Sequence, residues 1–474
     1  VYKRQVRYQD VLRTVRYENT SENPDTAARI ITFTAADPLS TGNTATTTLA
    51  ITAVNDTPVH TVPGAQSTPQ DTPLVFSPGS GNAIAVADPD ASTVEVTLTA
   101  TNGTVTVDLD GAIGDETLVN TTMTGTQDRP DIAVAADGSY VVAWASETGD
   151  GDGWGIYAQR YDAAGNAMGG EIAVNTSTTN DQLNPSVAID DAGNFVVAWE
   201  TNHLGSGYFN IYAQRFDSGG AKQGTEFRVD AVAGGDVVNA SAAMDADGDF
   251  VIAFENHVNH DGDGWGIYAR RYAADGTSQG GGFVVNSTTA GNQAAPSVAM
   301  DNAGNFVVAW GGPVGAESHI LYQRYDNTGA DVGGEMSATN AGYSAEVATD
   351  AAGNFVIVWQ NADADSWGIG ARRFNADGTP VAPEFQVNTE QISDQVYPDV
   401  AMNDDGEFVV VWESYSQDAA GTYGVYGRRY DATGTAVGGE FLVNSTTDGT
   451  QRAPAVALAD SGRIAAAWRG NGLG

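Results

Sequence analysis

Paired carboxylates recur in this chain at a spacing that suits a divalent cation. Three glycine-rich or acidic segments contain an Asp-x-Asp pair shortly before an aromatic residue: Asp150 and Asp152, Asp261 and Asp263, and Asp363 and Asp365. Two carboxylates that lie two residues apart can bind one hard cation when the loop folds round it, and calcium prefers such oxygen ligands. The pairs therefore predict calcium sites. The alternative is that they are solvated acidic turns.

The same segments carry aromatic side chains at equivalent places, which are Trp154, Phe209, Trp265, Trp367 and Tyr423. The apolar face of a sugar ring packs well on an aromatic ring. These five residues therefore predict a platform that binds a glycan. The alternative is that each ring covers the core between two repeated units.

Other catalytic signals are weak. His257, His260 and Asp261 stand close to Glu255 and have the chemistry of a zinc site, but the group occurs once and its residue types also suit an ordinary polar loop. The chain has no G-x-S-x-G segment and no phosphate-binding glycine loop. Sialidase-type boxes place Trp three residues after Gly, whereas here the aromatic follows after six. We predict no catalytic residues and expect that the protein is not an enzyme.

A long repeat positions these loops. Seven aromatic residues follow one another at intervals of 49 to 56 residues: Trp144, Trp199, Phe254, Trp310, Trp359, Trp412 and Trp468. A glycine stands six residues before each of them. A fixed period of this length is typical of stacked structural repeats.

Each repeat predicts four strands. Residues 185 to 240 contain the apolar runs PSVAID, FVVAWE, NIYAQRF and EFRVD, separated by Asp, Asn and Gly turns. No segment has helical periodicity with caps. Four antiparallel strands per repeat indicate the blade of a β-propeller, because a single blade buries its two apolar faces only against its neighbours.

The number of repeats predicts seven blades. Residues 130 to 453 hold six complete units, and residues 454 to 468 add the first two strands of a seventh. Residues 114 to 130 match residues 438 to 454 at 10 of 17 positions. We therefore expect residues 114 to 130 to supply the outer strand of the last blade. The third strand of that blade has no counterpart, so the ring should be incomplete.

An arginine and an aromatic residue recur in the third strand of every complete repeat, as in Arg160 and Tyr161. A glutamate opens the fourth strand in most repeats. A residue that every blade needs is usually part of the blade itself, and we expect structural pairs of arginine with carboxylate.

Composition limits the partners. The chain has 474 residues and a formal net charge of −39, which excludes nucleic acid and anionic membrane as favourable partners and favours cations. The absence of cysteine excludes disulfides and thiolate chemistry. Apolar runs are too short for a membrane span. The chain begins at Val1 without Met, and residues 1–5 are expected to be a sequencing artefact.

The segment before the propeller has sequence motifs that differ from those of the repeats. It contains VRYENTSENP, RIITFTAAD, AVNDTP and ADPDA. Residues 1–58 resemble the second half of a cadherin-like, immunoglobulin-type repeat of large bacterial adhesins, and residues 59–112 resemble the first half of the next one. The resemblance implies calcium at the junctions of the repeats, and the matching positions are Asp56, Asp88 and Asp90. Ordinary Asx turns are the alternative there.

The propeller of residues 113–474 is similar to D-x-x-G-N-F-V-V-x-W repeats that accompany calcium-binding arrays in bacterial proteins of the type I export pathway. These resemblances imply a fragment of an extracellular protein, secreted or attached to the cell surface and monomeric as a fragment. We expect an adhesion module that binds a glycan or a surface protein on calcium-stiffened stalk repeats. The alternatives are a carbohydrate-active hydrolase or lyase that uses rim carboxylates, and a structural spacer.

Overall fold

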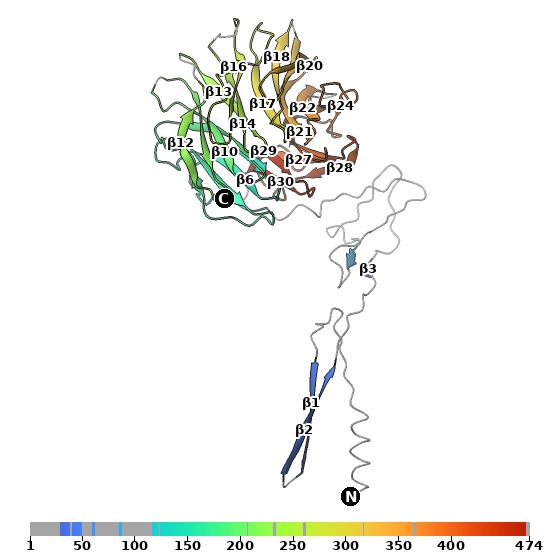
Figure 1. The fold of residues 1–474 in the computed structure, drawn as a ribbon. Coiled ribbons are helices and arrows are strands. Elements are labelled where there is room, and N and C mark those ends of the chain that lie inside the picture. Colours follow the sequence, from blue (N-terminus) through green and yellow to red (C-terminus); the bar gives the residue numbers. More distant parts are fainter. Residues whose placement is uncertain are drawn as a thin grey trace, which may run out of the picture. The chain divides into compact units, whose positions relative to one another are not determined.

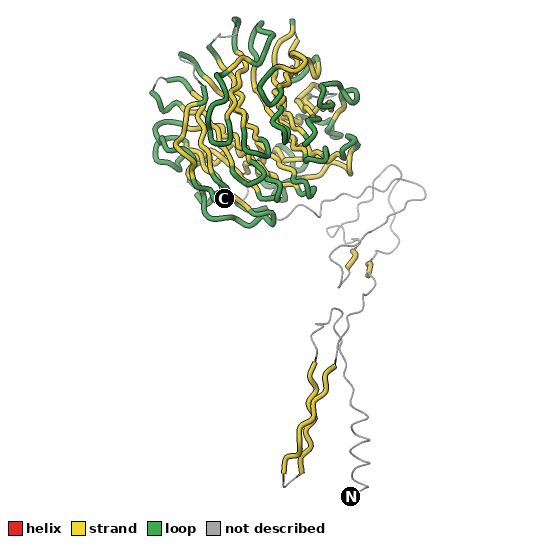
Figure 2. Tube along the Cα trace, viewed as in Figure 1, coloured by secondary structure: helices red, strands yellow, loops and turns green. Residues whose placement is uncertain are grey.

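The computed structural model describes residues 29–37, 40–49, 59–61, 85–87, 116–122, 124–205, 207–230, 234–258, 262–315, 317–363 and 366–470. The chain divides into two compact units, Val1–Val105 and Thr106–Gly474. Strands and turns make up the described residues, which contain no helix (Figures 1 and 2). These residues accordingly contain no helix long and apolar enough to cross a bilayer.

The described residues of the first unit form two antiparallel strand pairs. Strand β1 (Arg29–Asp37) pairs with β2 (Ser40–Leu49), and β3 (Val59–Thr61) pairs with β4 (Ala85–Ala87). The predicted calcium ligands Asp56, Asp88 and Asp90 lie outside the described residues.

The second unit is an all-β propeller with six four-stranded blades. Blade 1 contains β5 (Gln127–Val134), β6 (Tyr140–Ser146), β7 (Gly155–Tyr161) and β8 (Ile172–Ala173). Blade 2 contains β9 (Gln182–Ile189), β10 (Phe195–Thr201), β11 (Asn210–Phe216) and β12 (Lys222–Arg228). Blade 3 contains β13 (Val237–Met244), β14 (Phe250–Asn256), β15 (Gly266–Tyr272) and β16 (Phe283–Val284). Blade 4 contains β17 (Ala294–Met300), β18 (Phe306–Val314), β19 (Glu317–Tyr325) and β20 (Asp331–Thr339). Blade 5 contains β21 (Tyr343–Thr349), β22 (Phe355–Ala362), β23 (Trp367–Phe374) and β24 (Phe385–Gln386). Blade 6 contains β25 (Gln395–Met402), β26 (Phe408–Tyr415), β27 (Tyr423–Tyr430) and β28 (Ala436–Leu442).

A further two-stranded sheet follows blade 6. It consists of β29 (Gln451–Leu458) and β30 (Ile464–Gly470). Val456 packs with the core of blade 6, while Ala455 and Ala467 pack with that of blade 1. The first strands of successive sheets contact one another from β5 round to β29, and β29 contacts β5. These strands therefore form a closed inner ring.

The recurrent glycine makes the turn between the first two strands of a blade. Gly193 has φ of +82°, a conformation that side chains other than glycine rarely adopt. Asp190 accepts a hydrogen bond from the backbone N–H of Asn194 at 2.7 Å and another from its side-chain amide at 2.8 Å. The turn chemistry thus explains why a glycine stands six residues before each aromatic.

The second strand of each blade is buried on both faces. In β10, Trp199 packs with the core shared with blade 1, and Val196 and Ala198 pack with the core shared with blade 3. Removing either neighbour would expose one of these faces to water. This two-sided burial is the reason that repeats of this sequence pack face to face around an axis.

Neighbouring blades are also joined by polar contacts. Glu226 of blade 2 accepts hydrogen bonds from the backbone N–H groups of Thr176 and Ser177, which follow blade 1. The arginines differ from the prediction, because they donate to backbone carbonyls of the next sheet rather than to carboxylates. Arg324 donates to the carbonyl of Ala376 at 2.7 Å, and Arg271 to that of Thr328 at 2.5 Å.

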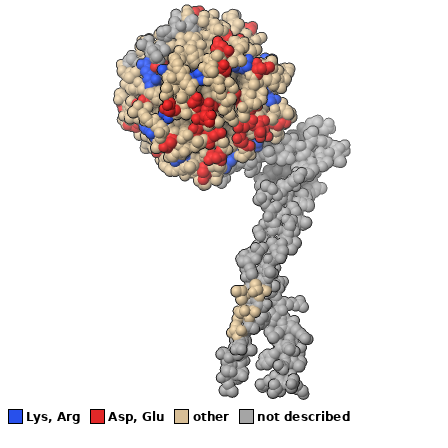
Figure 3. All heavy atoms as spheres, viewed as in Figure 1, with Lys and Arg blue, Asp and Glu red and all other residues tan. Residues whose placement is uncertain are grey.

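Figure 3 shows that acidic side chains outnumber basic ones on the face in view.

Candidate functional site

One position recurs in the first strands of all seven sheets of the second unit. It is the fifth residue of most first strands and follows a proline or alanine. Its occupants are Asp131, Ser186, Ser241, Ser297, Glu346, Asp399 and Ala455. Three of the seven residues are acidic, and they belong to blades 1, 5 and 6. We call Asp131, Glu346 and Asp399 the axial carboxyls.

Most oxygen-bearing side chains at this position satisfy the inner edge of the next blade. The backbone N–H of Val187 donates to Asp131 Oδ2 at 2.7 Å, and that of Val456 donates to Asp399 Oδ2 at 2.7 Å. The serine hydroxyl oxygen of Ser241 accepts in the same way from Val298 at 3.0 Å. A first strand has no neighbouring strand on its inner side, so the sheet offers no acceptor to the backbone N–H groups on that side. The side chains of the preceding blade supply those acceptors.

Burial raises the pKa of all three axial carboxyls. For Asp131 it raises the pKa to about 6, against hydrogen bonds from Val187 and Ile132 that favour the charged form. Burial is also the largest cause of the raised pKa values of Glu346 and Asp399, and repulsion between the carboxylates adds to it. The three groups are thus close enough for each charge to affect another.

The axial carboxyls differ in the hydrogen bonds that favour their charged forms. Asp399 accepts from the backbone N–H groups of Val400 and Val456 at 2.8 and 2.7 Å, which favours its ionised form. The hydrogen bond that lowers the pKa of Glu346 comes from the side chain of Ser297. Neighbouring carboxylates resist ionising together. The surroundings of Glu346 therefore favour its neutral form more than those of Asp399 favour the neutral form of that group.

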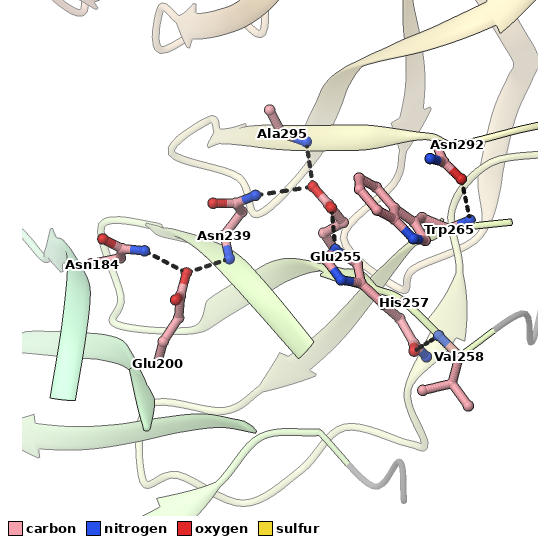
Figure 4. A network of polar contacts seen from close by, with 10 residues as sticks. Asn184, Glu200, Asn239, Glu255, His257, Val258, Trp265, Asn292 and Ala295 are labelled. Atoms are coloured by element: carbon pink, nitrogen blue, oxygen red, sulfur yellow. Dashed lines mark hydrogen bonds and ion pairs between the residues drawn. The ribbon is translucent and has the colours of Figure 1, made fainter. Parts of the chain in front are cut away.

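A second group of carboxylates lies at the end of the second strands (Figure 4). Glu200 accepts hydrogen bonds at 2.7 Å from the side-chain amide of Asn184 and from the backbone N–H of Asn239. Asn239 has φ of +53°, so its N–H belongs to a bulge in the first strand of the next blade. Glu255 accepts likewise from Ala295 at 2.8 Å. These buried glutamates join one blade to the next through hydrogen bonds.

The structure describes part of the histidine cluster. Nε2 of His257 lies 2.5 Å from Glu255, and its ring stacks on Trp265 with the centroids 4.0 Å apart (Figure 4). His260 and Asp261 lie outside the described residues. Among the residues that the structure describes, no group of three or more His, Asp or Glu side chains has the arrangement of a metal site.

The predicted aromatic residues are all half-buried, and each lies against another part of the protein. Trp154 packs on the core between blades 1 and 2. Trp367 meets Tyr343 edge to face at 5.5 Å, and Tyr423 lies 4.3 Å below the guanidinium of Arg452. The backbone N–H of Phe209 donates to Asp236 at 2.9 Å. Glycan binding by these residues stays a prediction.

The Asp-x-Asp carboxylates turn back onto nearby amides. Asp150 Oδ2 accepts from the side-chain amide of Asn175 at 2.9 Å, and Asp152 Oδ2 from the backbone N–H of Asn180 at 3.3 Å. Asp263 accepts from Gly291 at 3.3 Å, and Asp363 from Ser366 at 3.1 Å. Asp365, like Asp261, lies outside the described residues. Calcium at these loops stays a prediction.

The axial carboxyls were not among the predicted site residues. The signal for them is present in the sequence, because the repeats align at the residue after a proline or alanine and that residue is acidic in three of them. Only the closed inner ring brings residues 131, 346 and 399 together, and the spacing of single repeats does not reveal it.

Comparison with protein-family models and with curated proteins finds no match for this sequence. Solved structures are similar at low identity. A protein of unknown function from Dyadobacter fermentans has 12% identity and a TM-score of 0.46, and the match covers 64% of this chain and 94% of that one. The NanB sialidase of Streptococcus pneumoniae has 10% identity and a TM-score of 0.43, with 76% and 68% covered.

An endo-arabinase from Bacteroides thetaiotaomicron has 15% identity and a TM-score of 0.33, and the match covers 55% of this chain and 95% of that chain. At these identities the likeness extends to the fold alone. It nevertheless corrects the expectation that the protein is not an enzyme, because solved structures with which this propeller aligns include a sialidase and glycoside hydrolases. The propeller fold therefore gives no ground for excluding catalysis.

Proposed function

We propose that the protein is a carbohydrate-active hydrolase that uses the axial carboxyls as its acid and base. The observation that carries the proposal is the meeting of Asp131, Glu346 and Asp399 on the inner ring, where burial raises their pKa values. Glycoside hydrolysis requires a protonated carboxyl beside a carboxylate, and different surroundings provide both at one pH.

The roles follow from the hydrogen bonds. Glu346 is the proton donor to the leaving oxygen, because its surroundings favour the neutral form. Asp399, whose charged form accepts two backbone hydrogen bonds, is the carboxylate that activates water or stabilises the developing positive charge. A cavity of about 1190 Å³ among the described residues lies elsewhere, and none of the axial carboxyls lines it.

The experiment is a survey of hydrolysis with aryl glycosides and plant or host polysaccharides, read by release of the phenol or of reducing ends. We expect turnover of at least one substrate class, and Glu346→Gln should lower kcat by about 10² to 10⁴. Ser241→Ala alters the equivalent position of blade 3 and serves as the matched control. Full activity of Glu346→Gln, or no turnover with any substrate, would contradict the proposal.

The wider setting belongs to the same proposal. We regard β29 and β30 as the inner half of a seventh blade, supported by their packing between blades 6 and 1. The resemblance of residues 1–112 to cadherin-like repeats supports an extracellular, calcium-dependent bacterial protein. The half-buried loop aromatics suit the stacking of sugar rings, and a glycan is accordingly the expected substrate.

A further inference from the structure

The two-stranded sheet borders a cavity with a volume of about 1190 Å³. Its walls come from β30 on one side and from residues 116–120 on the other, and side chains of blades 1 and 6 close it. Pockets for small ligands usually hold about 300 to 1,000 Å³. This cavity, which we call the slot, is larger and lies along a strand edge.

In the complete blades, the third strand covers the second one. The aromatic residue that begins the second strand stacks on the aromatic that ends the third, as in Phe408 and Tyr430 with centroids 4.5 Å apart. The later aromatic of the second strand is buried in all six complete blades, at 0 to 5% exposure. In β30 the corresponding residues, Ile464 and Trp468, are only half-buried, and both line the slot.

The place of a fourth strand beside the slot is already taken. Glu116 accepts hydrogen bonds from the backbone N–H groups of Ser445 and Thr446 at 2.5 and 2.9 Å. Glu226 and Glu335 make the same contact from the fourth strands of blades 2 and 4. Residues 116–120 therefore stand where an outer strand belongs. The position between them and β30 corresponds to that of one strand, and strands lie about 4.8 Å apart.

Polar groups at the end of the slot match the arginine of a third strand. In blades 1 to 5 this arginine donates to a carbonyl in the turn that follows the third strand of the next blade, as Arg324 does to Ala376. For a strand in the slot, that turn belongs to blade 1, and its residues Ala164 and Gly165 line the slot. Arg429 of blade 6 has no such turn ahead of it and donates to the carbonyl of Gly462 at 3.2 Å.

We propose that the slot binds an extended peptide segment with the pattern of this chain's own third strands, an aliphatic residue near its start and arginine followed by an aromatic residue at its end. The segment pairs antiparallel with β30 through backbone hydrogen bonds. Its aromatic residue covers Ile464, its middle covers Trp468, and its arginine reaches the turn at Ala164. Among the described residues β30 pairs with β29 alone, which leaves its other edge for this strand.

The test uses the whole chain and a fluorescently labelled peptide with the sequence of residues 155–161, GIYAQRY, which is the third strand of blade 1. Fluorescence anisotropy should show saturable binding. A scrambled peptide and a peptide with alanine in place of its arginine should bind at least about tenfold more weakly, which corresponds to about 1.4 kcal/mol. Hydrogen exchange should show new protection of amides in β30 when the peptide is bound.

Further measurements keep the proposal open to contradiction. Trp468→Ala should weaken binding, whereas Val284→Ala, at an exposed residue of β16 in blade 3, should leave it unchanged. Glu346→Gln should also bind normally, so that failure of the proposed hydrolase and failure of this inference can be told apart. Equal binding of the scrambled peptide, no protection of β30, or a stable dimer of the chain that protects β30 without peptide would overturn the proposal.

Discussion

The backbone N–H of Asn239 in β13 donates to Oε1 of Glu200 in β10 at 2.7 Å, so a carboxylate of one blade completes a bulge in the next. Glu200 is withdrawn from water at 4% exposure, whereas Asn239 is exposed. The same arrangement joins Glu255 to Ala295 and Glu413 to Ala453.

The first prediction concerns this bond. Glu200→Ala should lower the free energy of unfolding by about 1 to 3 kcal/mol, because it leaves the backbone N–H of Asn239 and the side-chain amide of Asn184 without this acceptor. Glu200→Gln keeps an acceptor and should cost less, in line with Gln360 at the equivalent position of blade 5. Urea unfolding followed by tryptophan fluorescence measures both variants. Equal losses for the two would contradict the stated cause.

Stability should depend on pH through the axial carboxyls. Their folded-state pKa values are raised, so the folded protein binds protons more tightly than the unfolded chain. The stabilisation is complete below the unfolded pKa of about 4 and is lost as the pH rises through about 6 and above. We expect urea midpoints to fall between pH 4.5 and pH 8.

A double variant tests that origin. Glu346→Gln combined with Asp399→Asn removes two of the titrating groups and should flatten the decline. Thermal melts of both proteins across the same pH series provide the comparison. An unchanged slope in the double variant would assign the pH dependence to other groups.

The turn glycines offer a third prediction. Gly353 has φ of +81°, and a Cβ added there would lie 2.8 Å from Asp301 Oδ2 of the preceding blade. Gly353→Ala should therefore destabilise the propeller by at least about 1 kcal/mol. Gly170→Ala is the control, because that glycine has open space around it and no positive φ. Differential scanning calorimetry should show a lower melting temperature for Gly353→Ala and an unchanged one for Gly170→Ala.

Closure of the ring can be measured with an ion pair. Arg469 Nη1 lies 3.0 Å from Asp128 Oδ2, and the two residues are 341 positions apart. A double-mutant cycle with Arg469→Ala and Asp128→Ala should give a coupling energy of about 0.2 to 1 kcal/mol, since both side chains are partly exposed. Raising the salt concentration should reduce that energy. A coupling of zero at low salt would mean that the pair adds nothing to closure.

The repeat fold was predictable because its signals are local and occur many times. A glycine such as Gly193 and an aromatic such as Trp199 recur at fixed separation in each unit, and the turns and strands between them followed from residue types. The prediction of six four-stranded blades is confirmed. The prediction that the recurrent arginine pairs with a carboxylate was wrong. Its partner is a backbone carbonyl of another blade, which has no signature in the sequence.

The candidate site was predictable only in part, since it depends on geometry between distant blades. Asp131 and Glu346 are 215 positions apart in number and occupy ordinary first strands. The prediction favoured the variable loops, where Asp150 and Trp154 stand, because loop residues usually carry function. Closure of the inner ring brings the axial carboxyls together, and that closure is a property of the whole chain.

The hydrogen bonds of Glu116 have a consequence for synthesis of the protein on the ribosome. Its partner Thr446 is 330 positions later in the chain. At about 5 to 20 residues per second, Glu116 emerges roughly 15 to 70 s before that partner does. The first segment of the propeller must therefore remain without this hydrogen-bond partner while nearly the entire domain is translated.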